Sequence, residues 1–528
     1  MTTAPHAVAD NFIRQGLIMT DRFYITTPIY YVNDKPHIGH AYTTLACDVL
    51  ARFQRLDGCD VKFLTGTDEH GQKVEEAAGK AGIAPQDFTD HVSQNFQDLA
   101  TRMNYSHDEF IRTTSQRHKA TCQKLWQRLV DRGHIYLGKY AGWYSVRDEA
   151  FYTETEIIDG KAPTGAPVSW VEEPSYFFDL SKWEDKLLAF YDENPDFVAP
   201  TSRFNEIKSF VKGGLKDLSV SRASFKWGVP VPGDDDHVMY VWLDALTNYL
   251  TAAGWLDDEA SYDKWWPANV HMVGKDIVRF HAVYWPAFLM AADLPLPKRI
   301  YAHGWWTNEG QKISKSLGNV IDPHALVDEF GLDQTRYFML REVPFGNDGD
   351  FSRQAMIQRI NSDLANDLGN LSNRVQSLIV KNLDGVYPNV SETPHADDQE
   401  MLAQIDGLLP KVRDAFLAQQ FHEGLRHIWD VISQANRYID TQAPWALKKT
   451  DPARMAEVLA VLMEAIRSSA ILVQTIMPGS AAALLDQLKV PEDNRGFDSL
   501  GKRRADLPVI IEKPQAVFPR FIAEEQDS

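Results

Sequence analysis

Apolar positions near the start of the chain follow strand-like and helical patterns in turn. The segment FYITTPIYY (23–31) is a largely apolar run, which predicts a buried strand that enters a loop. Over residues 41–56 the apolar side chains recur at helical spacing, and Gly58 follows as a stop signal. VKFLTGTD (61–68) predicts a second strand. Strand, helix and strand in this order form a βαβ unit, which favours a parallel sheet.

A second set of elements is predicted further along the chain. VMYVWLDAL (238–246) and NVHMV (269–273) read as strands, and a helix over 276–292 precedes another strand in RIYAHGWW (299–306). We expect both sets to contribute to one split sheet. The segment between the two sets, 135–229, is made of short aromatic-rich stretches, and it is predicted to be an insertion.

Beyond about residue 350 the pattern becomes helical throughout. Apolar residues keep helical spacing over 360–378, and further amphipathic stretches cover 397–420, 421–440 and 453–477. The predicted fold class is therefore α/β, a split Rossmann-type parallel sheet with an inserted connective domain, followed by an all-α helical bundle. The predicted parts are an extension (1–18), the first half of the sheet domain (19–134), the insertion (135–229), the second half (230–298), a linking region (299–350), the helical domain (351–510) and a tail that folds back (511–528).

Composition limits the classes of protein to consider. At 528 residues the chain exceeds what one ordinary core supports, and its hydrophobic (44%) and charged (24%) fractions are typical of a globular protein. The net charge is 54 − 73 = −19, and residues 351–528 alone hold 19 lysines and arginines against 24 aspartates and glutamates. This balance argues against a generic nucleic-acid coat protein, whose binding depends on phosphate neutralisation. Any RNA binding must therefore use a few directed side chains.

Cysteines and apolar runs indicate the compartment. Cys47, Cys59 and Cys122 are the three cysteines, and none belongs to a C-x-x-C pair, which argues against a disulfide scaffold and a thiolate zinc site. A reducing cytoplasm suits such a chain. No apolar run is long enough to span a membrane, and residues 1–18 lack the pattern of a secretory signal. They are expected to be a loose extension, with Met19 as an alternative start.

The tetrapeptide His37-Ile38-Gly39-His40 is predicted to lie between the first strand and the first helix. In open parallel sheets, ligands gather at the carboxyl ends of the strands, where helix N-termini attract phosphate. Gly39 leaves room for a nucleotide, and two imidazoles can donate hydrogen bonds to charge that develops during phosphoryl or nucleotidyl transfer. The plainer interpretation is a loop that holds two histidines by chance, because four-residue motifs recur.

A lysine-containing motif, KISKS (312–316), follows later between Gly310 and Gly318. Two lysines in a small-residue loop suit a mobile clamp on pyrophosphate, although a lone lysine run is usually a solvated loop. In this order the two motifs resemble the HIGH and KMSKS elements of the class I aminoacyl-tRNA synthetases.

That resemblance implies a reaction and its site residues. An amino-acid carboxylate attacks the α-phosphate of ATP, and Mg²⁺ accompanies the triphosphate. The residues that would stabilise the transition state are His37, His40, Lys312 and Lys315. The residues that would bind ATP are these four together with Gly39, Gly274, Asp276 and Ser314. The two sheet halves would form the catalytic domain, and 299–350 the stem-contact region with the KISKS loop.

Four further blocks resemble those of the methionyl-tRNA synthetases. They are PIYY (28–31), GTDEHG (66–71), YVWLDA (240–245) and GKDIVRFH (274–281). The resemblance implies that Asp68 pairs with the α-ammonium group of L-methionine and that Asp276 reaches the ATP ribose. It also implies a methionine side-chain pocket lined by Pro28, Ile29, Tyr31, Trp242, Ala245, Leu246, Tyr249, Ile277 and His281. An aromatic slot suits a thioether, because sulfur gains from aromatic contact.

Most of these residues also have a plainer interpretation. Asp68 and Asp276 could be helix caps or turn residues. Trp242, Tyr249 and Ile277 are of types that usually pack in a core, and a histidine in mid-helix is usually a core or surface residue. Only the ensemble of blocks favours a binding pocket.

The helical half holds a third group of residues. Asn370 and Arg374 are four apart on a predicted helix and share its face, and Trp445 lies in the loop after another helix. Reading unstacked bases needs hydrogen-bonding side chains and an aromatic stacking surface. In the family that the chain resembles, matching positions read the CAU anticodon of tRNA(Met), so the resemblance assigns that role to these three residues. The plainer interpretation is a tryptophan packed at a helix N-terminus.

The chain departs from the family pattern in its insertion and at its end. Many members hold zinc knuckles in the insertion, but YAGWYSVRDEAFYTE (140–154) has no cysteine, so no structural zinc is predicted. Some members append a dimerising module, whereas this chain ends soon after VFPRF (517–521), so a monomer is expected. The insertion is far smaller than the editing domains of the isoleucyl, valyl and leucyl relatives, and discrimination would rest on the synthetic pocket.

Other class I synthetases and two other kinds of protein are alternatives. A cysteinyl synthetase would need zinc-binding cysteines in its pocket, and the isoleucyl and valyl enzymes would need the large insertion. The histidines at 37 and 40 and the lysines at 312 and 315 are all present, which argues against an RNA-binding paralogue that has lost catalysis. A small-molecule nucleotidyltransferase with the same histidine loop would have no use for the helical half. The resemblance covers about residues 22–521.

Overall fold

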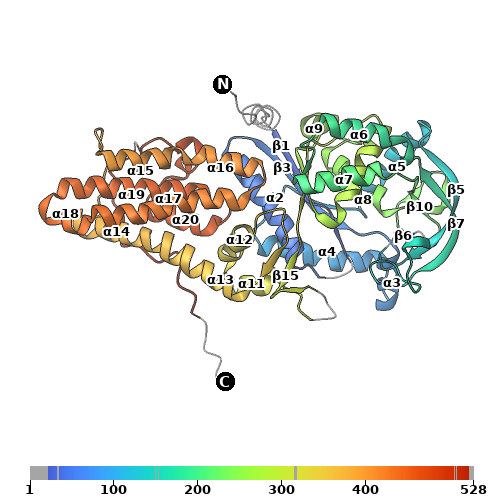
Figure 1. The fold of residues 1–528 in the computed structure, drawn as a ribbon, viewed down its shortest axis with the longest axis horizontal. Helices are drawn as coiled ribbons and strands as arrows, with labels where there is room; N and C mark the ends of the chain where they lie inside the picture. The colour runs from blue at the N-terminus through green and yellow to red at the C-terminus, as the bar shows by residue number, and fades with distance from the viewer. Residues whose placement is uncertain are drawn as a thin grey trace, which may run out of the picture. The chain divides into compact units, whose positions relative to one another are not determined.

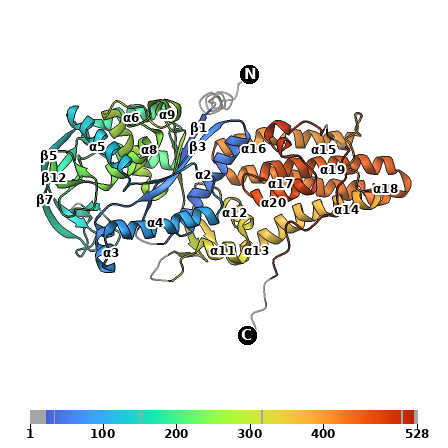
Figure 2. The same cartoon turned by 180° about the vertical axis from the view of Figure 1, so that it is seen from behind.

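The computed structural model describes residues 22–32, 35–148, 150–152, 154–313, 318–504, 506 and 508–522. The predicted extension, the alternative start at Met19, and the motif residues Ser314 and Lys315 lie outside the described residues. The chain divides into two compact units (Figures 1 and 2). The sheet unit comprises the described residues of 20–47 and 60–303, and the helical unit comprises the described residues of 48–59 and 304–528. No helix in the described part of the chain is long and apolar enough to cross a membrane.

Seven of the described strands form a parallel sheet in the sheet unit. The strands are β1 (Arg22–Thr26), β2 (Tyr30–Tyr31), β3 (Asp60–Asp68), β4 (Glu109–Arg112), β8 (Val198–Ala199), β13 (Val270–Gly274) and β14 (Ile300–His303). Their order is β2-β3-β1-β13-β14-β8, with β4 also paired to β3, and every pairing is parallel. Strands β1 and β13 are neighbours although they are far apart in sequence. The predicted split parallel sheet is therefore confirmed.

The helix predicted between the first two strands is α2 (Ile38–Leu56), which begins three residues earlier than expected. Gly58 adopts φ 89°, a left-handed conformation that glycine adopts without strain. The other α-helices of the sheet unit are α3 (Gln72–Ala81), α4 (Pro85–Arg102), α5 (Gln116–Asp131), α6 (Glu184–Glu193), α7 (Thr201–Lys212), α8 (Val241–Ala253), α9 (Glu259–Trp265) and α10 (Trp285–Ala291). Side chains of α5, α8 and α10 share one core with β1, β3, β13 and β14.

The strand predicted over 238–246 was wrong. Strand β12 (Asp234–Met239) ends early, and Val241 begins helix α8. β12 pairs antiparallel with β10 (Ser221–Arg222) and β11 (Pro230–Val231), outside the parallel sheet. From Leu243 onward every residue of α8 is buried, so the helix shows no solvent-exposed face there. A short apolar run of this kind cannot be told from a buried strand by periodicity.

The aromatic-rich segment 135–229 holds an antiparallel sheet and two helices. Strands β5 (Ile135–Ser145), β6 (Ala150–Tyr152), β7 (Ser169–Phe178) and β9 (Leu218–Ser219) lie in the order β6-β5-β7-β9. Helices α6 and α7 follow β7, and the two-residue strand β8 between them pairs with β14. The segment thus also supplies a strand to the parallel sheet.

The helical unit confirms the predicted all-α half. Its elements past residue 350 are α13 (Arg353–Arg359), a π-helix η6 (Ile360–Gly369), α14 (Asn370–Asn382), α15 (Ala396–Asp406), α16 (Leu408–Leu417), α17 (Phe421–Gln442), α18 (Pro444–Thr450), α19 (Pro452–Val473) and α20 (Pro478–Gln487). In both views α14, α15, α17 and α20 run alongside α19 (Figures 1 and 2). The C-terminal two thirds of α19 are buried throughout, so α19 is the central helix of the bundle.

Before the bundle, the helical unit contains α11 (Pro323–Phe330), α12 (Leu332–Arg341) and a small sheet of β15 (Trp306–Asn308), β16 (Gln311–Lys312) and β17 (Gly349–Phe351). On α12, the fully buried Arg336 binds the fully buried carboxylate of Asp48 at 2.6 Å. The tail lies against η6, because the backbone N–H of Phe521 donates to Asn361 Oδ1 at 2.8 Å.

Candidate functional site

His37 and His40 lie at the N-terminus of α2 with their rings in contact. The ring centroids are 3.9 Å apart, and the backbone N–H of His37 donates to Nδ1 of His40 at 3.1 Å. The backbone N–H of Gly39 donates to Nδ1 of His37 at 3.1 Å. A Cβ atom on Gly39 would lie 2.9 Å from the His37 ring, so glycine at this position lets the ring fold over the helix start. Both imidazoles thus stand where a helix N-terminus attracts anions.

Two predicted carboxylates lie at the carboxyl ends of parallel strands. Asp68 is the last residue of β3, is buried, and pairs in register with Tyr31 of β2. Asp276 is exposed in the helical turn that follows Gly274, the last residue of β13. A Cβ atom on Gly274 would lie 2.5 Å from Oδ1 of Asp276, so glycine makes room for this carboxylate. The sheet topology therefore brings both predicted ligand-binding groups to the edge where α2 begins.

Tyr249 and His281 form the centre of the predicted side-chain pocket. The Tyr249 hydroxyl lies 2.8 Å from Nε2 of His281, and Nδ1 of His281 lies 3.0 Å from the carbonyl oxygen of Ile277. A carbonyl only accepts, so Nδ1 carries the proton, and Nε2 of the neutral ring accepts from the tyrosine hydroxyl. Burial lowers the pKa of His281 to about 4, which keeps the ring neutral. On its other side Tyr249 stacks on His271 with ring centroids 4.0 Å apart.

The remaining pocket residues lie close to this pair. Ile29, Trp242 and Ile277 pack at the edge of the buried core that contains Leu246 and Tyr249. Pro28 and Ala245 are buried, and Tyr31 is half-buried. Trp242 stacks on Phe280 with centroids 3.5 Å apart, a partner that sequence reasoning did not expect. His281 and Phe280 belong to a π-helix, η4 (Phe280–Tyr284), a form of helix that is frequent at functional sites.

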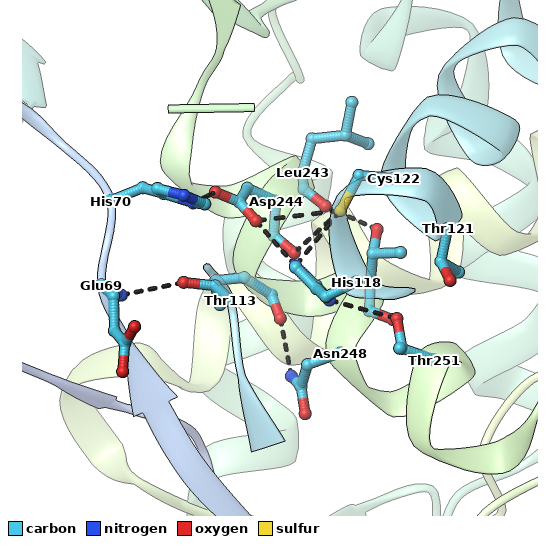
Figure 3. A network of polar contacts seen from close by, with 12 residues as sticks. Glu69, His70, Thr113, His118, Thr121, Cys122, Leu243, Asp244, Asn248 and Thr251 are labelled. Carbon is cyan, nitrogen blue, oxygen red and sulfur yellow. Dashed lines mark hydrogen bonds and ion pairs between the residues drawn. The ribbon is translucent and has the colours of Figure 1, made fainter. Parts of the chain in front are cut away.

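A buried polar cluster, His70, His118, Cys122 and Asp244, was missed by the sequence reasoning. We call it the Asp244 network (Figure 3). His70 Nδ1–H donates to Oδ2 of Asp244 at 2.6 Å, and His118 Nε2–H donates to Oδ1 at 2.7 Å. Burial alone would raise the pKa of the Asp244 carboxyl, but the two histidines outweigh it and hold that pKa well below its usual range. The only sequence signal was that His70 and Asp244 stand inside the GTDEHG and YVWLDA blocks.

His118, Cys122 and Asp244 each offer a metal-ligand atom, and these atoms lie within 4.8 Å of one another. The His118 Nε2 and Asp244 Oδ1 atoms, however, are 2.7 Å apart, which is the length of a hydrogen bond. Two ligands of a tetrahedral zinc, each about 2.0–2.2 Å from it, would lie about 3.4 Å apart. Burial and the charge of Asp244 raise the pKa of the Cys122 thiol, which disfavours a thiolate ligand. The geometry is that of a hydrogen-bonded network.

In the helical unit, Lys312 stands exposed at the end of a hairpin. β15 and β16 are joined by Glu309 and Gly310, both with positive φ, and Thr307 pairs with Lys312. The Asn319 side chain donates to the carbonyl oxygen of Lys312 at 3.1 Å. This bond ties the two ends of the loop that contains Ser314 and Lys315, whose own placement lies outside the described residues.

Arg374 and Trp445 come together on the surface of the bundle. The Arg374 guanidinium lies 5.6 Å from the centroid of the Trp445 ring and pairs with Asp440 at 2.8 Å. Trp445 is at the N-terminus of α18 rather than in a loop, and it is 47% exposed. Asn370 is exposed at the start of α14, one turn from Arg374. The left-handed conformation of Ala443 (φ 44°), which is costly for a residue with a Cβ, turns the chain toward Trp445.

Comparison with known families matches nearly the whole chain. The family model described as tRNA synthetases class I (M) matches residues 23–167 and 164–376. A second model, the anticodon binding domain of methionyl tRNA ligase, matches residues 388–527.

Individual relatives are similar over the same length. A methionine–tRNA ligase of Rickettsia felis is 56% identical over 515 residues, which are 95% of this chain and 99% of that protein. One of Mesorhizobium japonicum is 55% identical over 96% of this chain and 98% of its own. Among solved structures, the Mycobacterium tuberculosis methionyl-tRNA synthetase in complex with methionyl-adenylate is 51% identical with a TM-score of 0.92, covering 95% of this chain and 100% of that chain.

Proposed function

The chain belongs to the class I methionyl-tRNA synthetases, and we propose which of its residues carry out each step of methionine–tRNA ligation. As a methionine–tRNA ligase it uses ATP to activate L-methionine as methionyl-adenylate and transfers the methionyl group to the 3′ end of tRNA(Met). The observation that carries the proposal is that the two histidines of α2 and the carboxylates Asp68 and Asp276 all belong to one edge of one parallel sheet.

The activation step is an in-line displacement at phosphorus. The methionine carboxylate forms a bond to the α-phosphorus of ATP, taken up as its magnesium complex, and the bond to the pyrophosphate oxygen breaks. His37 and His40 are proposed to donate hydrogen bonds to the charge that develops on the phosphate oxygens. Lys312 and Lys315 are proposed to follow the leaving pyrophosphate, because a lysine is a point charge on a flexible stem.

ATP is proposed to lie across the start of α2 and the end of β13. Gly39 and Gly274 leave space at these two points, and Asp276 is exposed for the ribose hydroxyls. Ser314 is proposed to contact the phosphates from within the KISKS loop, a role that rests on its place in the motif.

Methionine is proposed to place its ammonium group at Asp68 and its thioether in the pocket around Tyr249 and His281. The neutral state of His281 supports this assignment, because a charged wall would disfavour an apolar side chain. The other proposed lining residues are Pro28, Ile29, Tyr31, Trp242, Ala245, Leu246 and Ile277.

The anticodon is proposed to be read by Asn370, Arg374 and Trp445. The exposed Trp445 ring offers a stacking surface, and the Arg374 guanidinium beside it offers hydrogen-bond donors. A few such directed contacts account for specific RNA binding by a chain of net charge −19.

No structural zinc is proposed. At the tip of the β5–β6 hairpin, the Asp148 carboxylate accepts hydrogen bonds from Tyr152, at 2.9 Å, and from the hydroxyl of Thr164. Arg147 donates to the carbonyl oxygen of Thr164 at 2.7 Å. These bonds tie the hairpin where a zinc knuckle would otherwise do so. Elemental analysis of the purified chain should find no stoichiometric zinc, and one zinc per chain would contradict this part of the proposal.

The predicted division of the chain is also proposed to be functional. The two sheet segments, 19–134 and 230–298, would form the catalytic domain around the connective segment 135–229. Residues 299–350 would contact the tRNA stem, and residues 351–510 would bind the anticodon.

We further propose that the protein acts as a monomer in the cytoplasm. None of its three cysteines forms a disulfide and two of them are buried, as suits a reducing compartment. Light scattering at micromolar concentration should give the mass of one chain; the mass of a dimer would contradict the monomer.

Amino-acid-dependent exchange between ATP and pyrophosphate tests the proposed substrate. Each of the twenty amino acids is supplied in turn, and exchange should occur with methionine alone. Exchange with none of them, or mainly with another amino acid, would overturn the assignment of the pocket.

A further inference from the structure

The Asp244 network contains one polar atom that the described protein does not satisfy. His70 is 2% exposed, and its Nδ1–H donates to Asp244. Its other ring nitrogen, Nε2, is buried and has no hydrogen-bond partner among the described residues. Buried polar atoms are nearly always paired in folded proteins, so an unpaired one leaves a position for a partner outside the chain, a ligand or an ordered water.

The loop that carries His70, residues 69–71, is fixed on both sides of it. The carboxylate of Glu69 is bound by Arg112, with Nε–H donating at 2.6 Å, and by the hydroxyls of Thr67 and Thr114. The Trp227 indole N–H donates to the carbonyl oxygen of Glu69 at 2.6 Å, and Gly71 N–H donates to the carbonyl oxygen of Trp227 at 2.9 Å. The His70 ring also meets the Trp227 ring edge-on at 5.5 Å. His70 therefore cannot turn to pair Nε2 elsewhere without breaking these contacts.

Asp244 sets what Nε2 can do. A carboxylate only accepts, so Nδ1 of His70 carries a proton, and the neutral tautomer with this proton has its lone pair on Nε2. His118 holds the other oxygen of Asp244, and Nδ1 of His118 lies 3.1 Å from the Thr251 hydroxyl of α8 (Figure 3). Asp244 is on the same helix as Trp242 and Tyr249, so the network ties the 69–71 loop to the helix that forms the proposed methionine pocket.

We infer that Nε2 of His70 accepts a hydrogen bond from the α-ammonium group of bound methionine, and that Asp244 is the positioning residue that orients the ring for it. This inference rests on the proposed function, in which Asp68, two residues earlier at the end of β3, pairs with the same ammonium group. An ammonium has three N–H donors and can be shared between a carboxylate and an imidazole acceptor.

Three substitutions separate this role from a structural one. His70→Asn keeps an N–H donor near the position of Nδ1 but has no atom at Nε2. Asp244→Asn keeps the shape of the side chain but presents one donor where two acceptors are needed. His134→Asn is the matched control, because His134 makes a similar pair with Asp179 at 3.1 Å and has no place in the network. For each variant, the KM values for methionine and ATP in pyrophosphate exchange are compared with the melting temperature.

His70→Asn should raise the KM for methionine about tenfold, the effect of one lost charge-assisted hydrogen bond, with the KM for ATP and the melting temperature nearly unchanged. Asp244→Asn should raise the KM for methionine at least as much and also lower the melting temperature. His134→Asn should leave both KM values unchanged. An unchanged KM for methionine in His70→Asn overturns the inference, and that variant decides the matter alone if Asp244→Asn does not fold.

Two competitive inhibitors test the ammonium contact itself. L-Methioninol retains the ammonium group, whereas 4-(methylthio)butanoate lacks it. His70→Asn should weaken inhibition by methioninol about tenfold and leave inhibition by the butanoate unchanged. Equal loss for both compounds, or zinc bound by the wild type and lost in Asp244→Asn, overturns the inference. Failure of the proposed function itself is distinguishable, because the wild type would then show no exchange with methionine.

Discussion

The hydroxyl of Tyr249 and Nε2 of His281 lie 2.8 Å apart inside the buried core of the sheet unit. Because the backbone of Ile277 fixes the proton of His281 on Nδ1, the tyrosine hydroxyl donates to Nε2. The bond joins α8 to the π-helix after β13, the two elements that form most of the proposed methionine pocket.

Removal of this hydroxyl should weaken methionine binding. Tyr249→Phe leaves Nε2 of the buried His281 without a donor, which costs about 1–3 kcal/mol. We expect a lower melting temperature and a KM for methionine raised by about tenfold or more, with the KM for ATP unchanged. Tyr262→Phe is a matched control, because its buried hydroxyl has no hydrogen-bond partner among the described residues and lies on α9. Equal effects of the two substitutions on the KM for methionine would contradict the role of Tyr249.

Stability should fall in mild acid because of the buried histidines. Burial lowers the pKa of His281 from 6.5 to about 4, and it also lowers the pKa of His271. Between pH 6.5 and pH 4 the histidine of the unfolded chain binds a proton, whereas His281 of the folded chain does not. The contribution of the neutral ring to the free energy of unfolding is therefore fully present above pH 6.5 and declines as the pH falls toward 4. For His281 alone the loss is about 3 kcal/mol. Urea unfolding at several pH values should show a shallower decline for His281→Gln; identical slopes would contradict the prediction.

The two lysines of the KISKS motif should act on the chemical step. Lys312→Ala and Lys315→Ala should each lower the rate of pyrophosphate exchange by about a hundredfold or more, because each removes a charge that stabilises the transition state. Methionine binding, followed by tryptophan fluorescence, should persist in both variants. Lys489→Ala, an exposed lysine of the bundle, is the control. Loss of methionine binding in the motif variants would refute the clamp role.

Arg374 and Trp445 should affect tRNA charging without affecting adenylate formation. Trp445→Ala should raise the KM for tRNA about tenfold or more, because base stacking on an aromatic ring contributes about 1–3 kcal/mol. Arg374→Ala should act in the same direction. Arg426→Ala is the matched control, because Arg426 is an exposed, ion-paired arginine on α17 with no part in this group. If pyrophosphate exchange falls together with charging, these two residues are structural.

The parts of the fold that could be predicted are those with a clear period. β1, α2 and β3 follow one another as strand, helix and strand, and this order predicts parallel pairing of the two strands. In the bundle, polar and apolar residues alternate with the helical period, so the amphipathic helices could be predicted. Helix α8 was mistaken for a strand because it is buried on every side from Leu243 onward. The two-residue strand β8 is too short to carry a period, and it is placed only by its pairing with β14.

The candidate site was predictable where residues stand in motifs and unpredictable where distant segments meet. Asp68 and Asp276 follow strands, so the sheet topology alone places them at the same edge. His118 reaches Asp244 across 126 positions of sequence, and neither the period of α5 nor that of α8 indicates such a contact. The contact between Trp445 and Arg374 likewise depends on the turn at Ala443. The sequence gives no signal for this turn, because alanine seldom adopts positive φ.

Charging of tRNA(Met) tests the central claim most directly, because it requires methionine activation and anticodon reading in one assay. We predict that the purified chain attaches methionine to a transcript with the CAU anticodon, and that changing one anticodon base lowers kcat/KM at least about tenfold. Methionine-dependent pyrophosphate exchange should be equal with either transcript. Equal charging of both transcripts, or no charging with methionine, would contradict the account.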